Sequence, residues 1–179
     1  MLPLLVILAC GGLAFTGCGS SPISEWRRTK QTTDVSRWLI HCGNITWLNC
    51  QVSGRRDGAT AYDNIYQASQ GDPARRSCYG RAPGGSVRLD PRMLRAMRDL
   101  AKRGYSFRVT ALAGASHSRD SRHYVGVAFD VDTINGHRIA YGNPYWRKFL
   151  ARCRKLGATE TLGPGDRGHS THLHAAWPR

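Results

Sequence analysis

One stretch of the chain alternates acidic and apolar side chains with the two-residue period of a β-strand. In residues 126–134, Asp130 and Asp132 fall on one face of an extended chain, while Phe129 and Val131 fall on the other. A strand buried on both faces would leave these carboxylates in an apolar interior, which is costly unless they are paired or bind a metal. The pattern therefore predicts a sheet with one covered face and one open face.

A second segment, at residues 172–177, shows the same alternation with histidines. His172 and His174 point to one face of an extended strand, and Leu173 and Ala175 point to the other. We expect the apolar pair to face the core and both imidazoles to share the open face. The chain thus offers two strands that each present polar side chains on one side of a sheet.

Helix signals are clearest in two other segments. Residues 90–104 begin with an Asp-Pro pair and end with glycine, and residues 143–157 begin with Asn-Pro and end likewise. Apolar residues recur at spacings of three and four in both, so each helix buries one face. Residues 59–70 predict a further helix. Further strands are predicted at 86–90, 105–112 and 159–162.

Helices early and strands late in the chain are typical of an α+β fold. A chain of 179 residues has the size of one ordinary domain. We expect a single domain with a mostly antiparallel sheet, flanking helices and a polar site on the open face of the sheet. Residues 35–179 would form this domain.

Histidines and a carboxylate from the two alternating strands suggest metal chemistry. His123 stands just before the first strand and Asp130 within it, and histidines cluster again at 169–174. Two histidines and one carboxylate are a common ligand set of catalytic zinc, with the fourth position left for water. The residues alone leave open which histidine of the later cluster completes the set.

The segment SRHYVGVAFD, residues 121–130, resembles the SxHxxGxAxD motif of the zinc D-alanyl-D-alanine carboxypeptidases. These enzymes form a wider group with lysostaphin-type peptidases and the hedgehog signalling domain. The HLH segment at 172–174 is similar to the second motif of that group, HxH. The resemblance spans about residues 85 to 177 and implies one Zn²⁺ per chain, bound by His123, Asp130 and His174. It also implies hydrolysis of peptidoglycan stem peptides at or near D-alanyl-D-alanine, as a carboxypeptidase or an endopeptidase.

The chain departs from one branch of that group. The D,D-dipeptidases of vancomycin resistance carry a catalytic glutamate three residues before the last ligand, where this chain has Thr171. Streptomyces-type carboxypeptidases and penicillin-insensitive murein endopeptidases instead carry a histidine five residues before it, and His169 stands at that position. We therefore expect His169 to act in catalysis, with His172 supporting the site.

A substrate with a free terminal carboxylate needs an arginine or hydroxyl group to bind it. The sequence candidates near the motif are Ser121, Arg119 and Arg122, with Arg108 as a further arginine. Asp132 is interpreted as an outward or turn-forming acid, His117 as a loop residue that could line the cleft, and Glu160 as the end of a strand with no role as a base.

The N-terminal residues have the pattern of an export signal. Residues 1–15 are apolar and uncharged, too short to span a bilayer as a mature helix, and AFTGC at 14–18 resembles a lipoprotein cleavage site. We expect a signal peptide at 1–18, acylation at Cys18 and a polar tether at 19–34. The protein would be exported to the cell envelope and anchored by lipid to a membrane.

Export would place the remaining cysteines in an oxidising compartment. Four lie beyond Cys18, at positions 42, 50, 78 and 153. An even number predicts two disulfides, with three possible connectivities. Among these, we favour Cys42 with Cys50 and Cys78 with Cys153.

The formal charge of +14 predicts anionic partners. Basic residues are spread along the chain without an aromatic-interleaved block, so we expect an anionic cell wall or membrane surface and no nucleic acid. Two other functions stay open: a zinc module that binds cell-wall peptide or protein without hydrolysis, and a nuclease or nucleic-acid binder. The sequence leaves the oligomeric state undetermined.

Overall fold

The computed structural model describes residues 21–179, which form one small domain around a six-stranded sheet. The expected signal peptide and Cys18 lie outside the described residues. Four α-helices occur in the described part of the chain, at α1 (Pro22–Ile40), α2 (Ala61–Gln70), α3 (Pro91–Lys102) and α4 (Trp146–Lys155). None of these four is long and apolar enough to cross a membrane.

The strands run in the order β1-β4-β5-β8-β7, with β6 paired to β5 beside this path. Their bounds are β1 (Ile45–Trp47), β4 (Phe107–Ala111), β5 (Ala128–Ile134), β6 (His137–Arg138), β7 (Glu160–Leu162) and β8 (Leu173–Ala176). Two further strands, β2 (Ala74–Arg75) and β3 (Ser86–Val87), form a separate antiparallel pair.

The sheet is mixed, which corrects the expected mostly antiparallel arrangement. The edge strand β1 runs parallel to β4, whereas the other pairs of the sheet are antiparallel. Strand β1 has only three residues, Ile45–Trp47, and this is too short to show a periodic pattern in sequence. The chain reaches it directly from α1, a connection that the sequence did not predict.

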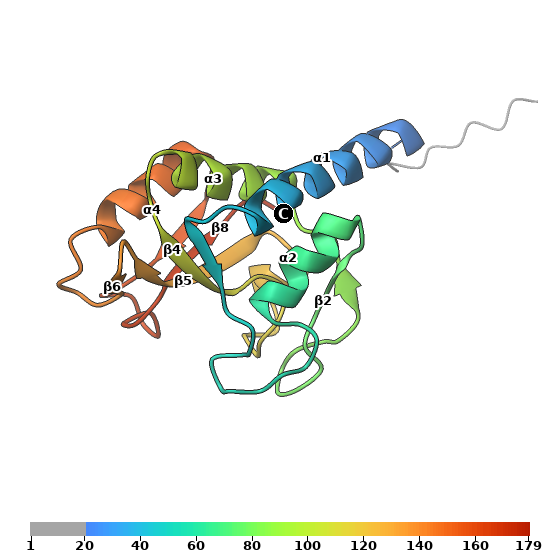
Figure 1. Ribbon diagram of the computed structural model, residues 1–179. Coiled ribbons are helices and arrows are strands. Elements are labelled where there is room, and N and C mark those ends of the chain that lie inside the picture. Colours follow the sequence, from blue (N-terminus) through green and yellow to red (C-terminus); the bar gives the residue numbers. More distant parts are fainter. Residues whose placement is uncertain (1–20) are drawn as a thin grey trace, which may run out of the picture.

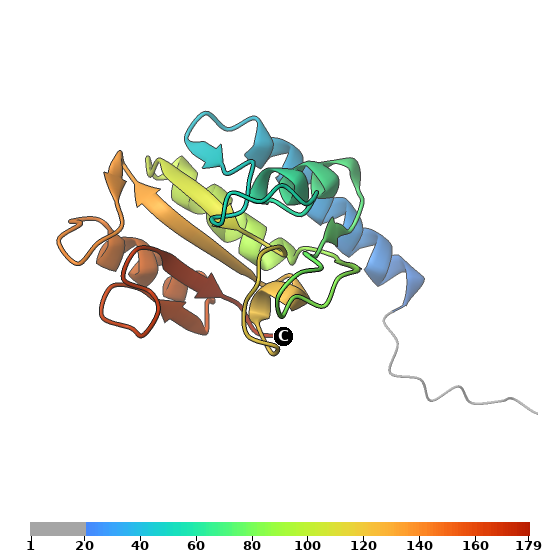
Figure 2. The same cartoon turned by 90° about the horizontal axis from the view of Figure 1, so that it is seen from below.

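Helices α3 and α4 cover one face of the sheet, as Figure 1 shows, and the strands lie in front of them when the molecule is viewed from below (Figure 2). Phe129 of β5 faces this helical layer, where its ring lies edge-on to Phe149 of α4 at 6.4 Å. Leu173 of β8 is buried in the same core. Alternation along the strands therefore turns Asp130 and His174 to the opposite face.

The helix signals at 90–104 are confirmed. Asp90 is the N-cap of α3, where its side chain accepts a hydrogen bond from the backbone N–H of Arg92, and Pro91 occupies the first turn. Helix α4 begins later than expected, at Trp146. Asn143 instead accepts a hydrogen bond from the backbone N–H of Tyr145 and donates to two backbone carbonyls of the preceding segment, so it fixes a loop before the helix.

Helix α1 replaces most of the expected tether, because the chain is helical from Pro22 onward. Its start carries ordinary signals, with Ser21 as the N-cap and proline in the first turn. The buried residues of this helix lie in its second half and include Thr32 and Ser36. Because these polar residues interrupt the apolar stripe, the sequence of this segment does not predict an amphipathic helix. Figure 1 shows the first turns of α1 extending beyond the body of the domain.

The expected disulfides are not formed. Cys42, Cys50, Cys78 and Cys153 are all free thiols in the described structure. Cys153 lies fully buried in the core, where burial raises its pKa to about 12, whereas Cys78 is exposed. The extended strand β1 stands between Cys42 and Cys50. The even number of cysteines in the sequence could not show that the thiols are free.

Candidate metal centre

The structure brings three side chains from distant segments to one point on the open face of the sheet. His123 Nε2 lies 3.2 Å from Asp130 Oδ1 and 3.1 Å from His174 Nδ1. The same carboxylate oxygen lies 2.8 Å from His174 Nδ1. These are the three residues that the motif resemblance implied as ligands.

Register across the sheet brings two of these residues together. Asp130 of β5 and His174 of β8 are direct partners in the antiparallel pair, so their side chains leave the same face at the same height. The buried neighbours Phe129 and Leu173 hold the register from the other face, because a slip by one residue would move them into solvent.

His123 reaches the same point from the short 3₁₀-helix η1 (Arg122–Val125). The Ser121 hydroxyl accepts a hydrogen bond from the backbone N–H of His123 at the start of this turn. Gly126 ends it with φ at +73°, and a Cβ there would lie 2.4 Å from the carbonyl oxygen of Arg88. Glycine is therefore required on both conformational and steric grounds, which explains its place in the motif.

Each imidazole has a partner that occupies its other nitrogen. His123 Nδ1 lies 2.6 Å from the backbone carbonyl oxygen of Leu112, so this nitrogen carries the proton and donates. His174 Nε2 lies 3.1 Å from Glu160 Oε1 and donates to that carboxylate. Both rings can then turn an unprotonated nitrogen toward Asp130, which is the arrangement of imidazole ligands in metal sites.

The donor set fits a tetrahedral metal. Ligand atoms around a four-coordinate zinc ion, with bonds of about 2.0–2.1 Å, lie about 3.3 Å from one another. The three separations of 2.8–3.2 Å are close to this value. All three side chains are at least nine-tenths buried, so few water molecules compete for them. The residues therefore fit one small divalent cation with an open position toward the cleft.

The charges around this point favour an ionised carboxylate. Burial by itself would raise the pKa of Asp130, but the neighbouring His123 and His174 hold that pKa well below its usual range. Burial lowers the pKa of His174, yet Asp130 and Glu160 together raise it above its usual value. Metal binding therefore competes with protonation of His174.

His117 also belongs to this cluster. His117, His123 and Asp130 offer ligand atoms within 4.8 Å of one another, a group that could hold a metal ion. The His117 ring, however, stacks on His123 at 4.0 Å with an angle of 9° between the planes. A metal lies in the plane of the imidazole that binds it, so one ion cannot lie in both parallel planes. His174 therefore completes the set better.

The environment of His117 keeps its ring neutral. Its Nε2 lies 3.1 Å from the carbonyl oxygen of Gly114, and burial, aided by the neighbouring His123, lowers the pKa of His117 to about 3. A neutral ring stacked on a ligand excludes water from that side and restricts rotation of His123. The sequence indicated only that His117 could line the cleft.

His169 and His172 stand at the edge of the same centre. The two ring centroids are 4.8 Å apart, and that of His169 is 6.0 Å from His174. His169 Nδ1 lies 2.9 Å from the backbone carbonyl oxygen of Arg167, which orients the ring. Burial lowers the pKa of His172, so this ring is neutral at neutral pH.

Glu160 is the site residue that sequence reasoning missed. The sequence placed it at the end of a strand without a site role, but β7 pairs with β8 and sets Glu160 diagonally next to His174. Its other oxygen, Oε2, lies 3.5 Å from Arg122 Nε. Only pairing between the two strands reveals this contact, so the sequence carried no local signal for it.

The centre opens into a cleft of about 540 Å³. Ser121 and Arg122 line it, as do the five histidines 117, 123, 169, 172 and 174. Arg122 is engaged with Glu160 and donates to the backbone carbonyl of Trp177. Arg119 is exposed and does not line this cleft, and Arg108 pairs with Asp132. Arg119 and Arg108 therefore do not line this cleft.

A second cavity, of about 270 Å³, meets the first at the metal centre. The two share His117, Asp130 and His172. Small side chains line the second cavity, among them Ala111 and Ala115, together with Arg138. No ion pair of Arg138 occurs with any residue in the described part of the chain.

Comparisons of the chain with family models, with curated proteins and with solved structures found no match.

Proposed function

We propose that the protein is a zinc metallopeptidase that hydrolyses peptidoglycan stem peptides at or near D-alanyl-D-alanine. The observation that carries this proposal is the convergence of His123 Nε2, Asp130 Oδ1 and His174 Nδ1 within 3.2 Å of one another. These residues stand in the two motifs, in the order of the peptidase group that the sequence resembles. Resemblance and geometry thus support the same ligand set.

Zinc is the metal that suits two imidazoles and one carboxylate with an open fourth position. When bound, it would supply a Lewis acid that polarises the scissile carbonyl and lowers the pKa of a coordinated water molecule. The groups that hydrogen-bond to the two imidazoles would tune the affinity of the site for zinc. The Leu112 carbonyl and the Glu160 carboxylate fix which nitrogen of each imidazole is free.

Proton transfer would fall to imidazoles, because the Glu160 carboxylate next to His174 is engaged. Glu160 is bound to His174 and lies near Arg122, and Thr171 stands where some relatives carry a glutamate. His169 is our first candidate for a group that takes a proton and returns it to the leaving amine. His172, kept neutral by burial, would steady the site and bind the carbonyl oxygen of the substrate.

The two cavities would hold the substrate on either side of the scissile bond. The second cavity has room for small side chains, and Arg138 at its wall could bind a carboxylate. Ser121 and Arg122 remain candidates in the main cleft, where Arg122 also positions Glu160. We propose Arg138 in place of Arg119 as the arginine that recognises an anionic group of the peptide.

The proposed substrate agrees with the expected export. A peptidoglycan enzyme must work outside the cytoplasm, and residues 1–18 have the sequence of a lipoprotein signal. Attachment at Cys18 would hold the protein at a membrane of the cell envelope. The high positive charge would favour anionic wall or membrane surfaces.

Mass spectrometry of purified muropeptides treated with the zinc-loaded protein tests the proposal. Loss of one alanine would establish carboxypeptidase action, and conversion of cross-linked dimers to monomers would establish endopeptidase action. The His123→Ala variant serves as the inactive control. A zinc-loaded wild type that leaves all muropeptides intact would contradict the proposal.

A second candidate is a zinc module that binds cell-wall peptide without cutting it. The observation that favours it is that Glu160, which contacts His174, is engaged by that ring and lies near Arg122, while position 171 is threonine. Such a module would bind muropeptides with a measurable affinity and release them unchanged. Binding measured by calorimetry, without products in the mass spectra, distinguishes it from the enzyme.

A further inference from the structure

The first turns of α1 present an unusual exposed surface. Ile23 and Trp26 are 65% and 63% exposed, although large apolar side chains are usually covered. Arg27 and Lys30 follow at the spacing that keeps all four on one side of the helix. We call these four residues the outward face of α1. They lie opposite the buried side of the helix, which includes Val35 and Leu39.

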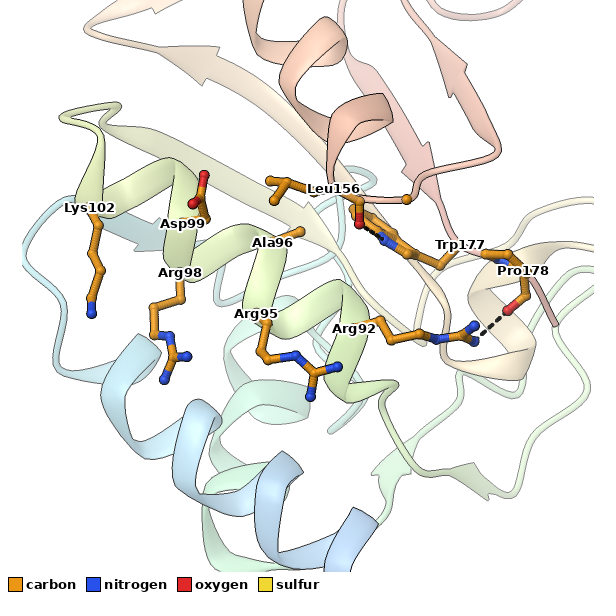
Figure 3. Close-up of a pocket in the computed structure, with 10 residues that line it drawn as sticks. Arg92, Arg95, Ala96, Arg98, Asp99, Lys102, Leu156, Trp177 and Pro178 are labelled. Atoms are coloured by element: carbon orange, nitrogen blue, oxygen red, sulfur yellow. Dashed lines mark hydrogen bonds between the residues drawn. The ribbon is translucent and has the colours of Figure 1, made fainter.

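A row of basic residues on α3 borders this helix. Arg92, Arg95, Arg98 and Lys102 recur at spacings of three and four, and they line an open depression of about 570 Å³. Figure 3 shows Arg95, Arg98 and Lys102 on the side of α3 that turns toward α1. Arg95 donates a hydrogen bond to Gln31 of α1, and the Lys102 ammonium lies over the ring of Trp38. We call these four residues the basic row.

Arg92 of the basic row pairs with Asp90, but among the described residues no acidic partner neutralises the other three members of the row. Asp99, the acidic residue in the depression, is bound by Arg103 and Arg152. Neither Arg95 nor Arg98 forms an ion pair with any residue between 21 and 179. An anionic ligand would therefore meet several available guanidinium and ammonium groups together.

We propose that the outward face of α1 and the basic row form a docking surface for an anionic phospholipid bilayer. Tryptophan and isoleucine beside arginine and lysine are typical of helices that lie in the membrane interface. A soluble anionic polymer would use the basic row, but it would gain nothing from Ile23 and Trp26. The apolar residues therefore favour a lipid surface over a wall polymer.

The position of α1 in the chain supports this occupant. The apolar run of residues 1–15 and Cys18 directly precede Pro22, the first residue of the helix. Four residues of extended chain span at most about 14 Å, so a segment held in the lipid would keep the start of α1 within reach of the membrane surface. The helix would thus meet the bilayer at a high effective concentration.

Docking through this surface would leave the metal centre accessible. The basic row lies on the side of α3 away from the core, whereas Asp130 and His174 lie on the face of the sheet opposite to α3 and α4. The cleft would then open away from the lipid. A membrane-held protein in this orientation could reach a large substrate above the bilayer.

Fluorescence of the full chain on vesicles with brominated acyl chains tests the docking. The chain has five tryptophans, so the emission of the Trp26→Phe variant is subtracted from that of the wild type, and the difference reports on Trp26 alone. We expect phosphatidylglycerol vesicles to quench most of this difference at low salt and phosphatidylcholine vesicles to leave it. Equal quenching by both lipids, or quenching by neither, overturns the proposal.

Charge variants test the basic row. Arg95→Gln and Arg98→Gln should each weaken docking on phosphatidylglycerol about fivefold, and the double variant about 30-fold. Arg56→Gln with Arg81→Gln removes the same charge from loops that lie at the bottom of Figure 1, and it should leave the docking within about twofold.

The outcomes of this comparison are distinct. Equal losses in the two double variants would show a general charge effect and overturn the assignment to the basic row. Binding of soluble polyphosphate, without quenching of Trp26 by lipid, would identify a polymer partner and overturn the lipid surface. Thermal unfolding midpoints equal to that of the wild type establish that these substitutions leave the fold intact.

Discussion

Asp130 and His174 face each other directly across the β5–β8 pair, with 2.8 Å between Oδ1 of the carboxylate and Nδ1 of the ring. Two candidate ligands are thereby held side by side by the backbone pairing of neighbouring strands. His123 joins them from a short capped turn that packs on the same strand. Such a site is preorganised for a metal before one binds.

The ligand set predicts which variants lose the metal. His123→Ala, Asp130→Ala and His174→Ala should each reduce bound zinc from one equivalent per chain to well below that, because a site of two ligands binds zinc weakly. His117→Ala should keep the full equivalent, since its stacked ring cannot share the ion with His123. Metal analysis after dialysis measures this. A full equivalent of zinc in His174→Ala, with none in His117→Ala, would show that His117 is the third ligand in place of His174.

Glu160 is predicted to position His174 and to tune metal affinity. Glu160→Ala should weaken zinc binding about 10–100-fold, because the donor Nε2 of His174 loses its partner. Glu160→Gln keeps an oxygen that accepts the same hydrogen bond and should lose less. Competition with a chromophoric chelator gives both affinities. Equal affinity in the wild type and the alanine variant would show that the contact plays no part in metal binding.

His169 is predicted to act in catalysis and not in metal binding. His169→Ala should retain one zinc and lose about 10²–10⁴-fold in turnover of a muropeptide, the usual contribution of a general acid or base. His172→Ala should also keep zinc, with a smaller loss if the ring only supports the site. Steady-state kinetics and metal analysis on the same samples separate the two effects. Turnover unchanged in His169→Ala would remove it from the mechanism.

Arg138 is predicted to recognise an anionic group of the substrate. Arg138→Gln should raise KM about tenfold or more with little change in kcat, because it removes an interaction made equally in the bound substrate and the transition state. Arg119→Gln is the matched control, since that exposed side chain lies outside the cleft. The wild-type KM in Arg138→Gln, with a raised value in Arg119→Gln, would restore the sequence-based assignment.

Asp90 is predicted to make the free energy of unfolding depend on pH. Burial would raise the pKa of Asp90, but the hydrogen bonds and charge of Arg92, with the charge of Arg28, lower it below its unfolded value. A depressed folded pKa contributes stability above the unfolded pKa of about 3.9, and this is lost as the pH falls through the folded pKa. Asp90→Asn should therefore be less stable than the wild type at pH 7, with the difference shrinking below about pH 4.

Urea unfolding of the metal-free protein at several pH values measures this difference. Asp63→Asn is a suitable comparison, because Asp63 also stands in a helix-capping arrangement, at the start of α2, but has no arginine partner among residues 21–179. A gap between the wild type and Asp90→Asn that stays constant from pH 7 to pH 3 would contradict the prediction.

Local patterns predicted much of the fold. The capped start of α3 and the strands around Asp130 and His174 follow from signals within a few residues, and the structure has them close to the expected bounds. Helix α1 escaped prediction because Thr32 and Ser36 occupy its buried side. Strand β1 escaped because three residues are too few for a period. In both cases the tertiary contacts outweigh the local preference.

The sequence determined which side chains share a face of each strand, because alternation is a property of the extended backbone itself. That was enough to put Asp130 and His174 on the open side of the sheet and their neighbours in the core. It could not determine what each residue meets, because a contact between positions 123, 130 and 174 depends on how distant strands align. The contact of Glu160 with His174, the stacking of His117 and the free state of the four cysteines were decided only by tertiary structure, since register and packing join segments far apart in the chain.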